Sequence, residues 1–161
     1  MAAMTGDDRN HRLAAPDRLK AMSGLEFLTA IKEGRLPAAP MAETLNFYLS
    51  EVDEGRVVFR GTPVFAHYNP IGSVHGGWAA TLLDSCMACA LQSTLPKGTG
   101  YTTLEFKVNL VRPITEETGP VEAEGKVVQA GRRVGVAEGW LRDGAGKLLA
   151  TGSTTCIILP L

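Results

Sequence analysis

The chain lacks what several classes of protein depend on. Its 161 residues contain 16 Lys and Arg against 17 Asp and Glu, so no charge excess favours nucleic acid or a membrane surface. Three cysteines, an odd number, do not suggest the disulfide framework of a small secreted domain. The polar N-terminus shows no secretory signal, and no apolar run is long enough to cross a bilayer. We therefore expect one cytoplasmic globular domain with neither nucleic acid nor membrane as a partner.

Several catalytic and binding motifs are also missing. We find no paired carboxylates, no metal-ligand spacing, no Ser-His-Asp order and no glycine loop of P-loop type. Cys86 and Cys89 form a C-x-x-C pattern, but it lacks a second ligand pair and lies in an apolar segment. Buried cysteine there acts as a small apolar residue. We expect no metal and no cofactor.

The most unusual stretch that is present covers residues 69–91, which read NPIGSVHGGWAATLLDSCMACAL. From Trp78 onward it predicts a helix that is apolar on all sides, and such a helix is buried. Asp84 is the single charge in it, and a buried carboxylate is costly unless it is neutralised, hydrogen-bonded or functional.

The glycine-rich approach to this helix predicts a binding site for a carbonyl oxygen. First-turn N–H groups lack helical acceptors and can stabilise an oxyanion, and Gly76 and Gly77 let a ligand come close to the backbone. Asp84 follows Gly76 by eight residues, which is ~12 Å along a helix. The two residues of one chain therefore cannot meet at one small atom, but a bent substrate or a second subunit could close the gap.

A family resemblance rests on these residues. The spacing from Asn69 to His75-Gly76-Gly77 and on to Asp84, followed by a strand ending in Arg112-Pro113, resembles the hotdog-fold acyl-CoA thioesterases of the PaaI-like and 4-hydroxybenzoyl-CoA thioesterase type. The resemblance covers roughly residues 40–159. It implies an α+β hotdog fold, in which a curved antiparallel sheet of about six strands wraps around one central buried helix. It also implies a homodimer with its site at the interface, paired further into a homotetramer.

The resemblance implies hydrolysis of an acyl-CoA to free acid and coenzyme A, so coenzyme A is part of the substrate. Asp84 would be the nucleophile or the general base, and the Gly76 N–H would hold the thioester oxygen. His75 would orient the loop or lie by the sulfur, although a lone histidine before a helix is more often a capping residue. Asn69 would contact the thioester or a catalytic water, or else it is a turn residue.

Further residues are expected to position water or bind substrate. Thr103 would position the attacking water, with Thr102 as the alternative after a register slip, unless both serve only as strand formers. Arg132 and Arg133 could bind coenzyme A phosphates, although solvated charges at a turn are more common. The remaining substrate-binding candidates are Gly77, Tyr68 and Trp78, and the acyl pocket is expected to involve Trp78, Met87 and Phe65.

Two other functions stay open on the sequence. A hydratase or dehydratase of acyl thioesters would use His75 and Asp84 as an acid–base pair. A non-catalytic hotdog protein would bind acyl-CoA without turnover.

The chain divides into three predicted parts: a disordered or loose arm (1–15), a helical extension with a linker (16–40) and the hotdog domain (41–161). Ser23 and Glu26 form a capping-box pattern, and Gly34 marks a helix end. Strict alternation in 102–111 puts Thr103 and Val108 on opposite faces. Strands are expected over 43–51, 56–61, 102–111, 119–129, 134–142 and 147–159.

Overall fold

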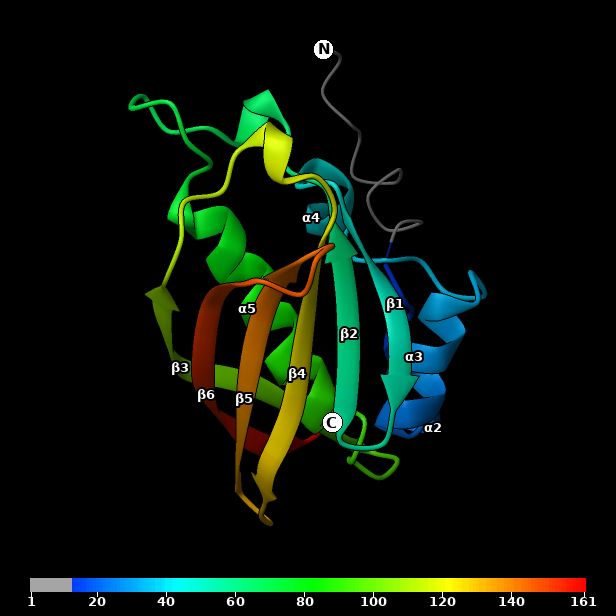
Figure 1. Ribbon diagram of the computed structural model, residues 1–161. Coiled ribbons are helices and arrows are strands. Elements are labelled where there is room, and N and C mark those ends of the chain that lie inside the picture. Colours follow the sequence, from blue (N-terminus) through cyan, green and yellow to red (C-terminus); the bar gives the residue numbers. More distant parts are fainter. Residues whose placement is uncertain (1–12) are drawn as a thin grey trace.

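The computed structural model describes residues 13–161, so most of the expected N-terminal arm lies outside the described part (Figure 1). One six-stranded antiparallel sheet has the order β1-β2-β4-β5-β6-β3, and helix α5 (Gly76–Gln92) lies against one face of it. This arrangement confirms the predicted α+β hotdog fold. No helix of the described residues is long and apolar enough to cross a membrane. The strands are β1 (Phe47–Asp53), β2 (Arg56–Gly61), β3 (Thr99–Leu110), β4 (Val121–Ala130), β5 (Val134–Asp143) and β6 (Leu148–Pro160).

Glycines on the sheet allow α5 to lie directly on the strands. Gly125 of β4 pairs with Gly139 of β5, which pairs in turn with Gly152 of β6. A Cβ at Gly125 would lie 2.2 Å from the carbonyl oxygen of Cys86, and one at Gly139 would lie 2.8 Å from Cγ of Met87. The three paired glycines therefore form a trough for the middle of the helix.

The sequence predicted a helix buried on all sides, but α5 is buried on most of its surface only. Nine of its residues are buried, among them Leu82, Leu83 and Met87. Ala80, Thr81, Asp84 and Ser85 are only partly buried, so this side is less covered than the side that lies in the glycine trough. The side that carries Asp84 is thus the accessible one.

Three short helices precede the sheet: α2 (Pro16–Ala21), α3 (Gly24–Lys32) and α4 (Pro40–Thr44). The capping box at the start of α3 is confirmed, since Ser23 Oγ accepts from the Glu26 N–H at 3.2 Å and Glu26 accepts from the Ser23 N–H at 2.7 Å. Gly34 follows the helix at φ 74°, a conformation that suits glycine.

The expected strand start at residue 43 is wrong. Pro40 instead begins helix α4, because proline at the first helical position has a helical φ and lacks an N–H that would be unpaired there anyway. Asn46, at φ 53°, then turns the chain into β1.

A β-bulge changes which side chains of β3 face the helix. Thr103 pairs with Cys156 and Glu105 with Thr155, so Leu104 is the extra residue. Thr103 reaches Asp84 of α5, and Val108 packs against the core. Both therefore face the helix, and the predicted strict alternation is wrong across the bulge.

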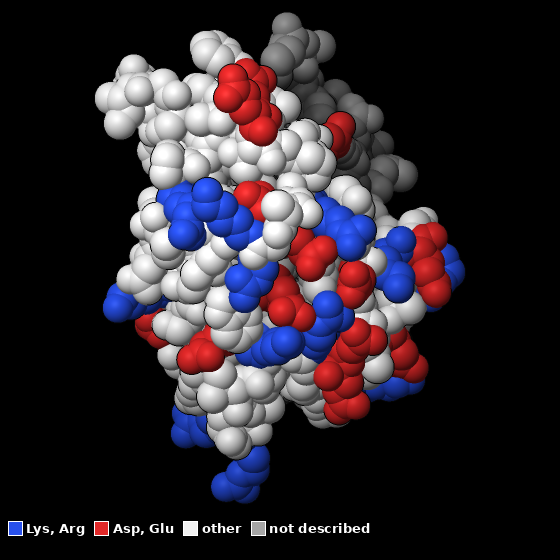
Figure 2. Space-filling view, viewed as in Figure 1, with Lys and Arg blue, Asp and Glu red and all other residues white. Residues whose placement is uncertain are grey.

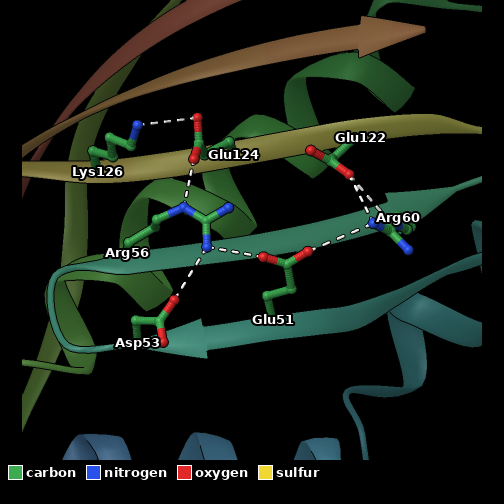
Figure 3. Close-up of polar contacts among 7 residues, drawn as sticks. All are labelled: Glu51, Asp53, Arg56, Arg60, Glu122, Glu124 and Lys126. Atoms are coloured by element: carbon green, nitrogen blue, oxygen red, sulfur yellow. Dashed lines mark hydrogen bonds and ion pairs between the residues drawn. The ribbon is translucent and has the colours of Figure 1, made fainter. Parts of the chain in front are cut away.

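The outer face of the sheet is covered by interleaved charges (Figure 2). Arg56 contacts Glu124, Glu51 (2.9 Å) and Asp53 (3.1 Å), as Figure 3 shows. Burial acts to raise the pKa of Glu124, but hydrogen bonds from Arg56 and Lys126 outweigh it and leave that pKa lowered. A face with this charge pattern suits solvent, while the opposite face carries the core.

Candidate active site

The N-terminus of α5 is fixed by hydrogen bonds on both sides of the glycine pair. The side chain of His75 caps the helix, because its Nδ1 accepts from the Gly77 N–H at 2.9 Å. The backbone N–H of His75 donates to the carbonyl of His67 at 2.8 Å, and that of Val74 donates to Ile114 at 2.8 Å. Within residues 13–161 the Gly76 N–H has no acceptor, so it is free to bind an external oxygen.

Asn69 shapes the loop that leads to this N-terminus. Its Oδ1 accepts from the backbone N–H groups of Ile71 (3.1 Å) and Ser73 (3.4 Å), and its Nδ2 donates to Ser73 Oγ at 3.1 Å. This is the turn role that the sequence allowed. Asn69 and Gly76 both line a small cavity of about 280 Å³.

Asp84 lies on a different cavity. Thr103 Oγ1 donates to Asp84 Oδ1 at 3.1 Å, a contact between β3 and α5 of the same chain. Burial raises the pKa of Asp84, and the hydrogen bond from Thr103 opposes that rise without cancelling it. Asp84 and both candidate threonines, Thr102 and Thr103, line a cavity of about 670 Å³. A partly desolvated carboxylate beside an apolar space is suited to act on a carbonyl carbon or on water.

One chain does not bring Asp84 and Gly76 together. They line separate cavities and lie eight residues apart on one helix, which corresponds to ~12 Å. The spacing of the motif had predicted this separation, and the structure places the two groups accordingly.

The residues expected to form the acyl pocket lie elsewhere. Trp78 is 3% exposed, and its indole N–H donates to the Leu45 carbonyl at 2.8 Å. Met87 is fully buried, whereas Phe65 is 73% exposed. None of the three lines either cavity, because the first two face the sheet and the third lies in the short helix η1 (Phe65–His67).

Two further candidates lie outside both cavities. The hydroxyl of Tyr68 accepts from the Glu116 N–H at 2.8 Å and so joins two loops. Arg132 and Arg133 are exposed in the β4–β5 turn. Trp78, near the start of α5, packs against Gly61, whereas Leu91, near the end of α5, packs against Gly135. Because Gly135 directly follows this turn in the chain, the turn lies beyond the C-terminal end of α5. In Figure 1 it is at the opposite end of the sheet from the Gly76 loop.

The sequence interpretation missed the residues that wall the larger cavity. They come mainly from the helices before the sheet, and they include Met22, Phe27, Ile31 and Met41. The available signal was the apolar side of the helix after Ser23, which indicated packing but not a partner.

Comparison with known proteins points to one family. The profile of the thioesterase superfamily matches residues 71–150. A candidate esterase of Caenorhabditis elegans is 31% identical over 117 residues, which are 71% of this chain and 68% of that protein. A candidate esterase of Halobacterium salinarum is 42% identical over 69 residues, 42% of this chain, and the match spans only 44% of that protein.

A solved structure agrees in fold. A candidate thioesterase related to phenylacetic acid degradation, from Ralstonia eutropha, has a TM-score of 0.74 at 28% identity, with 81% of this chain and 98% of that chain covered. The His-Gly-Gly loop and Asp84 both lie in the segment that the superfamily profile matches. The chain therefore belongs to the thioesterase superfamily and has the hotdog fold of its PaaI-like members.

Proposed function

We propose that the chain is an acyl-CoA thioesterase that hydrolyses acyl-CoA to free acid and coenzyme A. The observation that carries the proposal is Asp84, a lone carboxylate with a raised pKa on an apolar cavity, in a chain of the thioesterase superfamily. The Gly76 N–H, at the start of the same helix, supplies the electrophilic group that such a carboxylate needs.

Two chemical routes use these groups. As a nucleophile, Asp84 attacks the thioester carbonyl, the C–S bond breaks, the coenzyme A thiolate leaves, and water then hydrolyses the mixed anhydride. As a general base, Asp84 takes a proton from water, the resulting hydroxide attacks the carbonyl, and the proton passes to the departing sulfur. In both routes the Gly76 N–H stabilises the oxygen as it becomes negative, and one such donor contributes ~3 kcal/mol to lowering the barrier.

A second copy of the chain is proposed to complete the site. Strand β3 ends the sheet of the described residues, so its outer edge has no neighbouring strand. Leu104, Phe106 and Leu110 on β3 are 57%, 42% and 57% exposed. A long edge strand with exposed apolar side chains favours pairing with another chain. A dimer formed there would bring the Gly76 loop of one copy to Asp84 of the other, and two dimers would make the expected tetramer.

Substitution of Asp84 by asparagine tests the catalytic role. We expect turnover of acyl-CoA substrates, measured by free-thiol release, to fall by roughly 10²–10⁴-fold. Because burial raises the pKa of Asp84, its ionised form destabilises the fold above that pKa, so Asp84→Asn should melt at the same temperature as the wild type or higher at neutral pH. Full activity in this variant would end the proposal.

Mixing two inactive variants tests the shared site. Asp84→Asn is combined with Gly76→Pro, which removes the proposed N–H donor at the first residue of α5, a position where proline is tolerated. If each site uses Asp84 of one copy and Gly76 of the other, a mixed dimer has one intact site, and an equimolar mixture regains about a quarter of wild-type activity. A mixture as inactive as its components shows that the site is not shared.

The rival functions receive no specific support. Nδ1 of His75 is occupied in capping α5, which is the structural role, and His75 lies even farther along the helix from Asp84 than Gly76 does. A binding protein without turnover predicts the same cavity, and the thiol-release assay on wild-type protein separates it from an enzyme.

A further inference from the structure

The N-terminal helices form one wall of the cavity beside Asp84. Helix α3 and its neighbours make up this wall. The cavity has a volume of about 670 Å³, and Asp84 is the only charged side chain among the described residues that line it. Pockets that enclose most of a small organic ligand measure ~300–1,000 Å³. The space is therefore large enough for a bulky acyl group, and its walls are largely apolar. The apolar lining includes Met22, Phe27, Leu28, Ile31, Met41 and Phe47.

Helix α3 is held as a fixed wall. A Cβ at Gly24 would lie 1.6 Å from the carbonyl oxygen of Gln92, so the backbones of α3 and α5 touch directly. The Gly24 N–H donates to the carbonyl of Leu95 at 2.9 Å, and Leu28 and Ala30 are buried. These contacts join the start of α3 to the C-terminal end of the helix that carries Asp84.

Two side chains of α3 project from this wall into the cavity. Phe27 and Ile31 both line it, and residues four apart lie on the same face of a helix. Both are partly buried, so a change of size there alters the space available inside the cavity.

We propose that this cavity is the acyl pocket, that it takes uncharged apolar acyl groups of medium-chain or aryl size, and that Phe27 and Ile31 set its depth. The inference rests on the proposed thioesterase function. Among the described residues, no cationic side chain lines the cavity to pair with an acidic acyl tail, and Asp84 would repel one. A carboxylate buried without a partner is strongly disfavoured, so dicarboxylic acyl groups are excluded.

The pocket makes a quantitative prediction for straight-chain substrates. Burying one methylene contributes ~0.8 kcal/mol, which corresponds to about a four-fold change. From acetyl-CoA through butyryl-CoA and hexanoyl-CoA, kcat/KM should therefore rise by up to about four-fold per methylene until the pocket is filled. Glutaryl-CoA should fall roughly a hundred-fold or more below hexanoyl-CoA.

Three variants in the full chain test the assignment. Ile31→Trp fills the cavity and should move the preferred acyl length to shorter chains, whereas Phe27→Ala enlarges it and should move the preference to longer chains. Leu25→Ala is the matched control, because Leu25 lies on the same helix but does not line the cavity. It should leave the order of preference unchanged. Melting temperatures show whether each variant is folded.

Binding of non-hydrolysable S-alkyl-CoA thioethers separates this inference from the proposed function. If the wild type binds longer thioethers more tightly, and Ile31→Trp removes that dependence, the pocket is supported even where no thioester is hydrolysed. If acyl-CoAs are hydrolysed but neither kcat/KM nor thioether affinity depends on chain length, the pocket assignment is overturned and the thioesterase proposal stands. Equal binding of all thioethers by the wild type and Ile31→Trp also overturns it.

Discussion

Replacing Gly125 by alanine probes how the central helix is seated on the sheet. Gly125 lies on β4 directly beneath α5, and an added Cβ would lie 2.2 Å from the Cys86 oxygen, 2.4 Å from the Cys86 carbonyl carbon and 2.6 Å from the Met87 nitrogen. All three are backbone atoms in the middle of a helix, so none of them can rotate away as a side chain can.

The size of the effect follows from that contact. Cβ contacts below 3.0 Å are essentially never seen, so the helix and the strand must separate by about 0.8 Å. Overpacking a core costs ~1–3 kcal/mol when side chains can adjust, and a backbone contact belongs at the upper end of that range or above it. We expect Gly125→Ala to lose about 3 kcal/mol or more of unfolding free energy. For a chain of this size that is a melting temperature lower by ~6–12 °C.

Denaturant unfolding and thermal melting measure the loss, and Gly144→Ala provides the control. Gly144 has a single neighbouring atom, the Pro120 oxygen at 3.9 Å from a built Cβ, so alanine there should change stability by less than ~0.5 kcal/mol. Because Asp84 precedes Cys86 by two residues, the shift should also lower activity per folded molecule. Equal stability of the two variants would refute the proposed seating of α5.

Two further predictions concern charged groups. Thr103→Val removes a hydrogen bond that lowers the pKa of Asp84, so the acidic limb of the pH–activity profile should move to higher pH. Thr103→Ser keeps the hydroxyl and should keep the wild-type limb. Identical profiles for both variants would remove Thr103 from the site. Arg56→Met leaves Glu51, Asp53 and Glu124 without their shared cation and should lower the free energy of unfolding by ~1 kcal/mol, measured by denaturant titration. The loss should be smaller at high salt, and smaller at acidic pH, where Glu124 is protonated. A loss independent of salt would show that Arg56 acts through packing.

Features that depend on neighbouring residues were readable from the sequence. The capping box of Ser23 and Glu26 and the helix end at Gly34 both follow from conformational preferences within a few residues. The distance between Gly76 and Asp84 follows from helix geometry alone, which is why the separate positions of these groups could be predicted.

Features that depend on a distant partner were not readable. The bulge at Leu104 arises from how β3 pairs with β6, and alternation within β3 alone placed Thr103 on the wrong side relative to Val108. Trp78 is of a residue type that often lines ligand pockets, yet it faces the sheet. There its indole N–H donates to the Leu45 carbonyl, and its ring stacks on His67.

The sequence by itself determined that one long apolar helix carries a single carboxylate behind a glycine-rich loop, because hydrophobic pattern and spacing are local properties. Only the tertiary structure decided which side of that helix stays accessible and which residues wall the cavity beside Asp84. The wall is set by the contact of Gly24 with Gln92, residues that are far apart in the chain and lie close together only once α3 packs against α5.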